Sequence, residues 1–424
     1  KLDAKDAANA KTEEELRAKL ALPGVTWDYL RFVRGEDGKG GPWRPAAGTF
    51  EGWPKSAKDI KALDPCCGSG HFLVALFRHL VPIRMIEEGL QAREAVDAVL
   101  RDNIHGLEID ERCCQIAAFA LAFAAWTYPD SKEYRPLPEM HIACTGIGPQ
   151  ATETQWVKLA EEAGIPIDTD QLERVRNGLT NIHRLFSQAP TLGSLINPKK
   201  LSGDVFVADY EAIQPYLKAI KTGERSDDET REQVNAATDM INASHLLARK
   251  YTLVMTNVPF LGRGKQNDLL KTHLTLHYKD GRADLATAFV LRCLEFCEDS
   301  GATAIVTPQN WHALTNYARF RAHLLENYCW QTVVRLGPAA FQDMYWWAAN
   351  TLLSIYCSIK PSPDTRFSGL DVSPPREPRE KAHLLKSIPI TVAYQSAQLA
   401  NPDARIDLRE FAVTDYLRDY ANAH

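Results

Sequence analysis

The sequence predicts an α/β fold in which parallel strands alternate with crossover helices. Two strand–helix units follow one another near the amino end, and parallel neighbours need such helices between them. In the first unit, the apolar run 60–64 precedes a glycine turn and the helical pattern HFLVALFRHLVPIRMIEEGL. In the second, the run 104–110 precedes a helix over 111–126. The same alternation resumes after residue 250.

The remaining elements of the amino-terminal half follow from periodicity and breakers. Lys1–Leu22 is expected to form one charged helix that stops at Pro23-Gly24. Residues 35–54, rich in Gly, Pro and Trp, are expected to form a surface loop. A helix over 91–102 leads into the second strand, and 140–146 is a candidate third strand.

Region 151–250 has helical character. Apolar residues recur there at three- and four-residue steps, as in a helix face packed into a core: Leu172, Val175, Leu179, Ile182 and Phe186. The polar segment Thr222–Gln233 is expected to be a solvated link between helices. We therefore expect an inserted helical subdomain.

Beyond residue 250 we expect strands at 251–256 and 301–308 and helices at 283–299 and 317–328. The runs 331–337 and 350–358 are separated by roughly a dozen residues, which leaves no room for a crossover helix and predicts an antiparallel pair. After Lys360, the basic, proline-rich stretch SPPREPREK is expected to be a linker or exposed loop.

Composition excludes several classes of protein. Hydrophobic residues make up 45% and charged residues 24%, as in folded globular proteins rather than disordered or fibrous ones. The apolar run 116–126 is shorter than the roughly 20 residues that span a bilayer, so we expect neither a membrane protein nor a secretory precursor. The nine cysteines lack CxxC spacing, which predicts reduced thiols in a cytoplasmic protein and no metal site.

Charge also restricts how the protein could bind nucleic acid. The net charge is −5, so contact with DNA would need a local basic face or another subunit. The chain begins at Lys1 without a methionine, and we expect it to be a portion of something longer.

The segment Asp64–Phe72, DPCCGSGHF, joins the first strand to its helix, where ligands lie across strand ends in open α/β sheets. A phosphate-cradling GxxxxGK[ST] loop is excluded because no lysine follows the glycines. A dinucleotide GxGxxG loop is matched only weakly, since Leu73 holds its third glycine position. The remaining interpretation is S-adenosylmethionine, which has no phosphates. By itself, GSG after a strand also fits an ordinary tight turn.

A carboxylate at the end of the second strand suits the same ligand. Glu108 can accept two ribose hydroxyls in a bidentate manner. The next residue, Ile109, can pack on the adenine ring, and Asp64 can hold loop amides or reach the methionine ammonium through water.

The segment Thr256–Phe260, TNVPF, follows the 251–256 strand and suits methylation of an exocyclic or amide nitrogen. Such a nitrogen is a poor nucleophile, and two fixed acceptors on its hydrogens would direct its lone pair at a methyl group. The side-chain oxygen of Asn257 and the carbonyl of Val258 can be those acceptors. Pro259 stiffens the turn and Phe260 offers a face for a planar base. Alone, the tetrapeptide equally fits a structural proline turn.

The chain resembles the amino-methyltransferases of DNA, whose motifs are DPxxGSGxF and (D/N/S)PP(Y/F). The resemblance lies in three segments that follow in this order: DPCCGSGHF, GLEID and TNVPF. The stretches WRPAAGTFEGWP, GSLINP, NVPFLGRGKQ and TPQNW are similar to the large N6-adenine-specific methyltransferases of BREX- and DISARM-type phage-defence systems. The similarity runs from about Val25 to Ile359. It implies a Rossmann-like class I methyltransferase sheet with an antiparallel last strand pair and a helical insertion.

The resemblance also implies five segments and the roles of single residues. The segments are an N-terminal helix and loop (1–55), an S-adenosylmethionine-binding half (56–150), the helical insertion (151–250), a catalytic half (251–360) and a C-terminal linker or start of a further domain (361–424). The implied cofactor-binding residues are Asp64, Cys66, Gly68, Ser69, Gly70, Phe72, Glu108, Ile109 and Thr145. The implied catalytic residues are Asn257, Val258, Pro259 and Phe260. Phe260 and Phe341 would stack on the target base; the alternative for Phe341 is core packing with Tyr345, Trp346 and Trp347.

Three features depart from the family's pattern. Val258 stands where the family usually has proline, which keeps the carbonyl acceptor but predicts a less rigid turn. ACTG offers only Thr145 or backbone where the family often places an Asp on the adenine amine. The family's upstream aromatic-Thr-Pro motif is not visible in the sequence.

We therefore expect S-adenosylmethionine-dependent methylation of a flipped-out adenine in double-stranded DNA, within a bacterial defence system that has other subunits. This requires Asn257 to converge with the pocket under Gly68. The basic loop Leu261–Gln266 is expected to be flexible, either ordering on phosphates or cofactor or staying solvated. The alternatives are a glutamine-amide protein methyltransferase, a nicotinamide enzyme, and a DNA-binding scaffold with weak or partner-dependent methyl transfer.

Overall fold

The computed structural model describes residues 2–36, 38, 40–149, 152–155, 169–202, 228–341 and 350–407. The chain divides into two compact units: unit 1 contains Lys1–Ile60, Pro82–Gly89 and Tyr251–His424, and unit 2 contains Lys61–Val81 and Leu90–Lys250.

Unit 2 is built on parallel strands in the order β3-β4-β5. They span Ala62–Asp64, Ile104–Glu108 and His141–Cys144. The register pairs Asp64 with Gly106 and Glu108 with Cys144, so the carboxyl ends of the three strands lie at one edge. The three predicted strands are thus confirmed, each somewhat shorter than expected.

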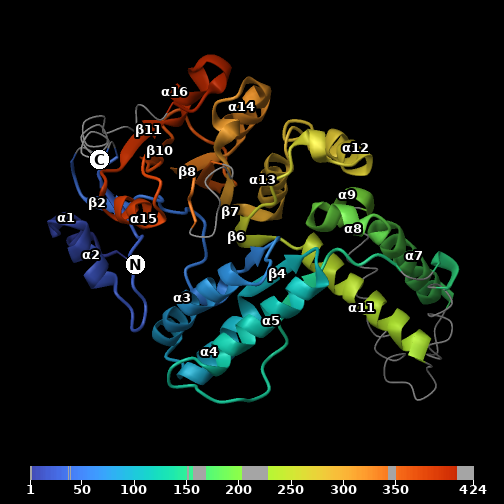
Figure 1. The fold of residues 1–424 in the computed structure, drawn as a ribbon. Coiled ribbons are helices and arrows are strands. Elements are labelled where there is room, and N and C mark those ends of the chain that lie inside the picture. Colours follow the sequence, from blue (N-terminus) through green and yellow to red (C-terminus); the bar gives the residue numbers. More distant parts are fainter. Residues whose placement is uncertain are drawn as a thin grey trace. The chain divides into compact units, whose positions relative to one another are not determined.

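Helices alternate with these strands, as predicted. They are α3 (His71–Glu88), α4 (Ala92–Asp102) and α5 (Glu111–Trp126). A capping box between Gln91 and Glu94 begins α4, and the Asp110 carboxylate caps α5 by accepting the Arg112 and Cys113 amides. α4 packs against β4, and α5 against β4 and β5 (Figure 1).

The described part of 151–250 is helical, as predicted. It contains α7 (Thr169–Phe186), α8 (Ala189–Leu192), the 3-10 turn η2 (Gly193–Leu195), α9 (Pro198–Ser202) and α11 (Asp228–Ala248). α7 and α11 lie side by side, and α11 contacts β4 and β5 (Figure 1). The helical region therefore belongs to the same compact unit as the glycine loop.

Two expectations for this region are only partly covered. Leu179, Ile182 and Phe186 of the apolar stripe are buried, whereas the side chains of Leu172 and Val175 lie outside the described residues. Residues 222–227 of the predicted polar link also lie outside them. Residues 228–233 belong to α11, so the link prediction is wrong there: the helix begins earlier than the charged composition suggested.

A buried histidine joins β4 to the segment after α11. Arginine can only donate, so His105 Nε2 accepts from the Arg249 guanidinium at 3.2 Å, and Nδ1 carries the proton that is donated to the Ala62 carbonyl at 3.1 Å. Burial, with the positive charge of Arg249, lowers the pKa of His105 to about 3. The imidazole is therefore a neutral link between β3, β4 and Arg249.

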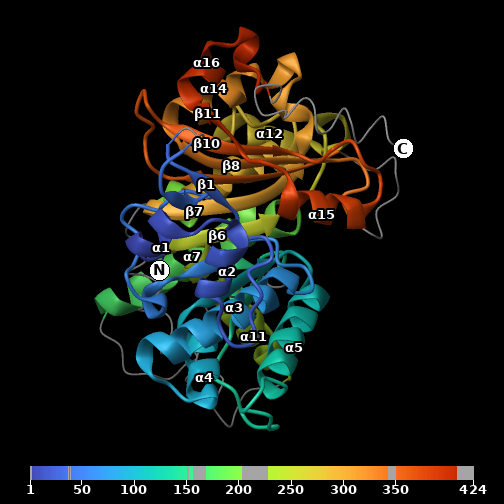
Figure 2. The ribbon, with the colours of Figure 1, turned by 90° about the vertical axis from the view of Figure 1, so that its left-hand side faces the viewer.

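In unit 1 the described residues form a mixed sheet in the order β11-β10-β8-β9-β7-β6. Figure 2 labels β11, β10, β8, β7 and β6 of this sheet in that order. The strands are β6 (Tyr251–Asn257), β7 (Cys297–Pro308), β8 (Cys329–Gly337), β9 (Thr351–Cys357), β10 (Arg366–Asp371) and β11 (Thr391–Tyr394). β6 and β7 are parallel, and β8 and β9 are antiparallel, as predicted. The α/β fold class is therefore confirmed, with β10 and β11 as additions beyond the antiparallel pair.

The helices of unit 1 include the two predicted at 283–299 and 317–328, but the prediction is wrong for residues 297–299, which belong to β7. These helices are α12 (Asp268–His277), α13 (Leu285–Phe296), α14 (Ala318–Asn327), α15 (Pro378–Ser387) and α16 (Gln395–Ala400). Short 3-10 turns are η1 (Ala57–Asp59), η3 (Arg263–Lys265), η4 (Gln309–His312), η5 (Thr315–Tyr317) and η6 (Pro402–Ala404).

The amino-terminal expectations need two corrections. The single helix over Lys1–Leu22 is wrong: α1 (Ala4–Asn9) and α2 (Glu13–Leu20) are separate, because the Thr12 hydroxyl accepts the Glu15 amide and caps a new helix. The loop expected at 35–54 contains β2 (Trp43–Pro45), which pairs with β1 (Phe32–Arg34).

The stretch SPPREPREK is not an exposed linker. Its proline at position 378 starts α15, where a missing amide hydrogen is tolerated. Its last residue, Lys381, is buried and donates from Nζ to the carbonyls of Leu336, Val372 and Ser373 at 2.6, 3.1 and 3.2 Å. Basic and proline-rich composition was therefore a poor guide to exposure.

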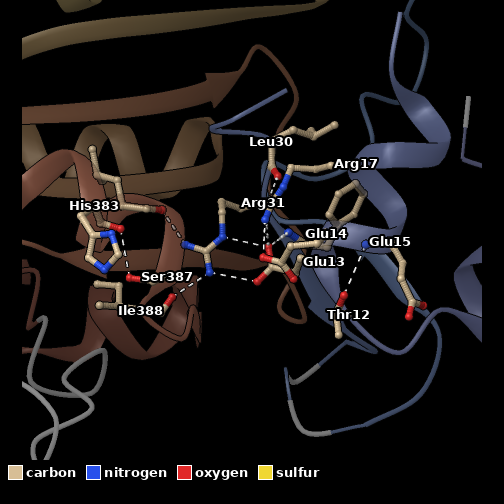
Figure 3. A network of polar contacts seen from close by, with 12 residues as sticks. Thr12, Glu13, Glu14, Glu15, Arg17, Leu30, Arg31, His383, Ser387 and Ile388 are labelled. Atoms are coloured by element: carbon tan, nitrogen blue, oxygen red, sulfur yellow. Dashed lines mark hydrogen bonds and ion pairs between the residues drawn. The ribbon is translucent and has the colours of Figure 1, made fainter. Parts of the chain in front are cut away.

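The other end of α15 is held by Arg31, shown in Figure 3. Its guanidinium donates to the carbonyls of Leu385 and Ile388, two of the acceptors left open at a helix carboxyl end. The same group makes a two-point ion pair with Glu13 at 2.8 and 3.0 Å (Figure 3). Arg31 thus fastens α2 and the β1 segment to α15.

No helix in the part of the chain that the structure describes is long and apolar enough to cross a membrane.

Candidate active site

The glycine loop of unit 2 leaves β3 at Asp64 and enters α3 at His71. Gly68 and Gly70 have φ values of +51° and +84°, a region that favours glycine. A Cβ on Gly70 would also lie 3.0 Å from the Ala117 Cα on α5. The turn therefore favours glycine at both positions, and the close approach of α5 favours it again at Gly70.

The loop is held from within by Asp64. This carboxylate is buried and accepts the Cys66 amide at 3.1 Å. The Cys67 amide in turn donates to the Leu107 carbonyl of β4 at 2.9 Å. Of the two roles expected for Asp64, holding loop amides is thus present in the structure, and contact with a ligand stays a prediction.

Glu108 connects the glycine loop to the turn after β4. Its Oε2 accepts the Gly68 amide at 2.8 Å, and its Oε1 accepts the amides of Ile109 and Asp110 at 2.9 and 3.2 Å. A carboxylate offers about four acceptor positions, so roughly one remains, on Oε2. That position suits one ribose hydroxyl. A bidentate grip on two hydroxyls requires a backbone bond to be exchanged.

Other predicted cofactor residues differ in exposure. Ile109 and Phe72 are 44% and 37% exposed, so both present apolar surface. The Ser69 hydroxyl lies 3.0 Å from His71 Nδ1 and is engaged with that neighbour. Cys66 is half-buried. Together with the acceptor on Glu108 and the bare backbone at Gly68, this set fits a ligand that has an apolar ring and hydroxyls.

Thr145 is fully buried rather than presented at a surface. Its amide and hydroxyl both donate to the Glu108 carbonyl, at 2.7 and 3.2 Å. In the structure its side chain therefore fixes the end of β4. Direct contact of this hydroxyl with an adenine amine stays a prediction and would require it to exchange that bond.

Sequence reasoning missed the residue that completes this arrangement, Ser194 of η2. Its hydroxyl donates to the Pro65 carbonyl at 2.6 Å and lies 3.4 Å from the Thr145 hydroxyl. Gly193 has a φ of +49°, and a Cβ there would lie 3.1 Å from Ile109 Cδ1. GSLINP thus joins the ends of β3, β4 and β5. The only signal in the sequence was the motif itself, which gave no role.

A thiolate nucleophile is not available in the loop at Cys67. Burial raises the pKa of the Cys67 thiol, and the negative charges of Asp64 and Glu108 raise it further. Cys67 is therefore uncharged at neutral pH and acts as a small apolar side chain. Among the described residues there is also no group of three or more His, Cys, Asp or Glu that could hold a metal ion.

The candidate catalytic turn belongs to unit 1, at the carboxyl end of β6. Asn257 and Pro259 are exposed, and Phe260 is 38% exposed, so this side chain is not in the core. Val258 is buried, and its amide donates to the Val306 carbonyl of β7 at 3.3 Å. Proline has no such donor. The valine therefore replaces ring stiffness with a hydrogen bond to the neighbouring strand.

The loop Leu261–Gln266 is more ordered than expected. It contains η3, and its backbone pairs with the start of α13: the Arg263 amide donates to the Ala283 carbonyl and the Leu285 amide to the Leu261 carbonyl. The buried Gln266 side chain also donates to the Leu261 carbonyl, at 3.0 Å. The expectation of a flexible loop is wrong because these bonds fix both of its ends.

Phe341 follows β8, in the connection to β9, as expected. It is 43% exposed, while the neighbouring Ala340 packs against the cluster that contains Leu336 and Val372. Tyr345, Trp346 and Trp347, the alternative packing partners, lie outside the described residues. The role of Phe341 in base stacking stays a prediction.

A family model, Eco57I restriction-modification methylase, matches residues 102–341, which is more than half of the 424-residue chain. The chain belongs to this methylase family. The match includes Glu108, GSLINP, the Asn257 turn and Phe341.

Within the methylase family, the chain is similar to two curated relatives. It is 27% identical over 299 residues to the adenine-specific methyltransferase BrxX of Escherichia coli O9:H4 (strain HS), covering 67% of this chain and 24% of BrxX. It is 25% identical over 296 residues to the adenine-specific methyltransferase PglX of Lacticaseibacillus casei (strain Zhang), covering 68% of this chain and 23% of PglX. The chain therefore spans about a quarter of the length of these relatives.

A solved structure of a restriction-modification enzyme is also similar to this methylase. It is the ATP-dependent Type ISP enzyme LlaBIII bound to DNA, at a TM-score of 0.47 and 16% identity, covering 84% of this chain and 20% of that one. The likeness is too weak to add to the fold assignment, which rests on the strands themselves.

Proposed function

We propose that this chain transfers a methyl group from S-adenosylmethionine to N6 of an adenine in double-stranded DNA, as part of a bacterial phage-defence system with further subunits in the cytoplasm. Family membership and the printed activity of BrxX and PglX support the proposal. The observation that carries it is the exposed Asn-Val-Pro-Phe turn at the end of β6, in a chain whose unit 2 carries the Gly68–Glu108 assembly.

The residues of unit 2 would bind the cofactor. Glu108 accepts a ribose hydroxyl at its remaining position, Ile109 covers one face of the adenine ring, and the backbone at Gly68 passes beneath the amino-acid end. Ser194 and Thr145 keep the three strand ends in place. When bound, S-adenosylmethionine supplies an electrophilic methyl group on a sulfonium.

The residues of unit 1 would prepare the base. The adenine leaves the duplex, at a cost of a few kcal/mol, and stacks on the exposed Phe260 ring. The Asn257 amide oxygen and the Val258 carbonyl accept the two N6 hydrogens, which localises the nitrogen lone pair toward the methyl. One N6 proton is then released to solvent. No strongly basic side chain is required.

Asn257→Ala tests this assignment. The variant loses an acceptor used only in the transfer step, so DNA methylation should fall by at least about 100-fold, the usual loss for one preorganised polar group. Binding of S-adenosylmethionine, measured by calorimetry, should not change, because the residue lies outside the cofactor set.

Phe260→Tyr is the matched control, since it keeps the stacking face of the ring. It should retain most of the methylation rate. Full activity of Asn257→Ala, or equal losses of activity and cofactor binding in that variant, contradicts the proposed role. If the chain transfers the methyl group to a glutamine amide of a protein and not to DNA, its function is that of a glutamine-amide protein methyltransferase.

A further inference from the structure

A strip of positive charge follows the candidate catalytic turn within unit 1. Residues 261–266 and 279–285 are joined backbone to backbone, with Arg263 N to Ala283 O at 3.1 Å and Leu285 N to Leu261 O at 3.0 Å. α12 leaves from the first of these segments and returns to the second (Figure 1). Their basic side chains are Arg263, Lys265, Lys279 and Arg282, which we call the basic strip.

The cations of the basic strip are not paired with the acids near them. Lys265, Lys279 and Arg282 are exposed. Within the described ranges, none of the four cations forms an ion pair with an acidic side chain. Arg263 is held in place instead, because its guanidinium donates to the Thr275 hydroxyl at 3.2 Å and the Arg282 carbonyl at 3.4 Å. The strip therefore combines one cation held by hydrogen bonds with three that are exposed to solvent.

The acids closest in sequence are engaged with other groups. Asp268 pairs with Lys271 at 3.6 Å, and Asp280 lies 3.7 Å from His323. One oxygen of Asp284 accepts the amides of Ala286 and Leu261, at 2.8 and 3.3 Å. These carboxylates reduce the field but do not bind the cations of the strip. In a chain of net charge −5, such a local surplus is the kind of face that phosphate binding needs.

We propose that the basic strip binds the phosphate groups that flank the target base in double-stranded DNA. The inference rests on the proposed function, since it takes the Asn257–Phe260 turn as the place that receives the base. Phe260 is followed directly by Leu261, the first residue of the strip's first segment. A base that leaves the stack remains attached to its own two phosphates. The cations next to Phe260 are therefore in the position to hold that backbone.

Charge-removing variants in the full chain test the strip. Fluorescence anisotropy measures how tightly each variant and the unaltered chain bind a mixed-sequence duplex. The variants are Lys265→Gln, Lys279→Gln, Arg282→Gln and the triple variant that combines them. The salt concentration is raised from about 50 to about 200 mM KCl, and each lost phosphate contact should lower the slope of log K against log salt by about 0.9. The triple variant should therefore lose about three units of slope.

Lys360→Gln is the matched control. Lys360 is exposed and lies three residues after Cys357. Cys357 pairs with Ala302 of β7. Asn257 instead pairs with Val306, near the other end of β7. Lys360 therefore lies toward the opposite edge of the unit 1 sheet from the turn. Its substitution should leave the slope unchanged. Thermal unfolding midpoints should be equal for all variants, since these side chains are exposed and unpaired.

The outcome separates this inference from the proposed reaction. If the chain methylates adenine but the triple variant keeps the full salt slope, or Lys360→Gln lowers it equally, the basic strip is wrong and the function stands. If the triple variant loses its slope while no chain methylates DNA, the strip is a phosphate-binding surface and the proposed reaction is wrong.

Discussion

Ser194 shows, at the scale of single residues, how a site can depend on a side chain that touches no expected ligand. Its hydroxyl bonds the carbonyl of Pro65, which is 129 residues away in sequence, and lies near the Thr145 hydroxyl, 49 residues away. Thr145 in turn bonds the carbonyl of Glu108. A shift of any one of these three strand ends would move the acceptor that we assign to the ribose.

We expect Ser194→Ala to weaken S-adenosylmethionine binding about 5- to 30-fold. The substitution leaves a buried carbonyl without its donor, a loss of about 1–2 kcal/mol in this setting. Isothermal titration calorimetry measures the change. Ser244→Ala is the control, because that hydroxyl is also buried and bonds a carbonyl, Ile241 of α11, at 2.8 Å but lies in no cofactor loop.

A Ser194→Ala chain that binds the cofactor as tightly as the unaltered chain contradicts the positioning role. Equal weakening by Ser244→Ala would also contradict it, because the effect would then be one of general stability.

The sequence could predict which loop and strand end of unit 2 carry the candidate cofactor residues, whose contact with a ligand stays a prediction, but not the residues behind them. The glycines at 68 and 70, and the acid at 108, follow strands whose ends must share an edge, so local pattern was sufficient. Ser194 could not be assigned because its partners depend on how the helical region folds back onto the sheet. Val258 likewise appeared as a weakening of the turn until its hydrogen bond to Val306 was seen.

At the scale of elements, α15 joins distant parts of unit 1. Arg31 binds its carboxyl end and Lys381 anchors its first turns to the ends of β8 and β10. The connection from β8 leads to Phe341, the candidate for base stacking. α2 is therefore fastened, through Arg31 and α15, to the strands that support this connection. Figure 3 shows the Arg31 contacts.

Arg31→Met should lower the free energy of unfolding by about 1–3 kcal/mol, because it removes the charge-assisted bond to Glu13 and leaves the carbonyls of Leu385 and Ile388 without this donor. Urea denaturation followed by circular dichroism measures this loss. Lys386→Gln also removes a link to α15, its 2.7 Å ion pair with Asp28, but both side chains are exposed. That control should leave the free energy of unfolding almost unchanged, because solvent screens an exposed pair.

Similar losses in the two variants would show that the contacts of the buried Arg31 add nothing beyond an exposed ion pair, which contradicts a fastening role for Arg31.

The bounds of helices were predicted well where an apolar helical pattern ran over many residues. They were predicted poorly where a capping residue or a tertiary contact determines where the helix begins or ends. α5 matches its predicted range, because an unbroken apolar pattern extends between an Asp cap and the following turn. The break between α1 and α2 depends on one threonine cap. α15 was missed because its buried lysine is satisfied by carbonyls from other strands, which charge composition does not reveal.

At the scale of the whole molecule, the fold class and family could be inferred from the order of the motifs, since strand ends and loop chemistry agree along the chain. The match over residues 102–341 establishes the methylase family. The chain spans about a quarter of the length of BrxX and PglX. The negative net charge and the basic strip together predict DNA binding that depends strongly on salt.

The central claim is that this chain methylates adenine at N6, and the product nucleoside tests it most directly. Unmethylated double-stranded DNA is incubated with the chain and isotope-labelled S-adenosylmethionine, together with partner subunits where these are known. The DNA is then digested to nucleosides and analysed by mass spectrometry. The account predicts labelled N6-methyldeoxyadenosine, absent with Asn257→Ala. Label on cytosine, or label on adenine that persists in that variant, would contradict it.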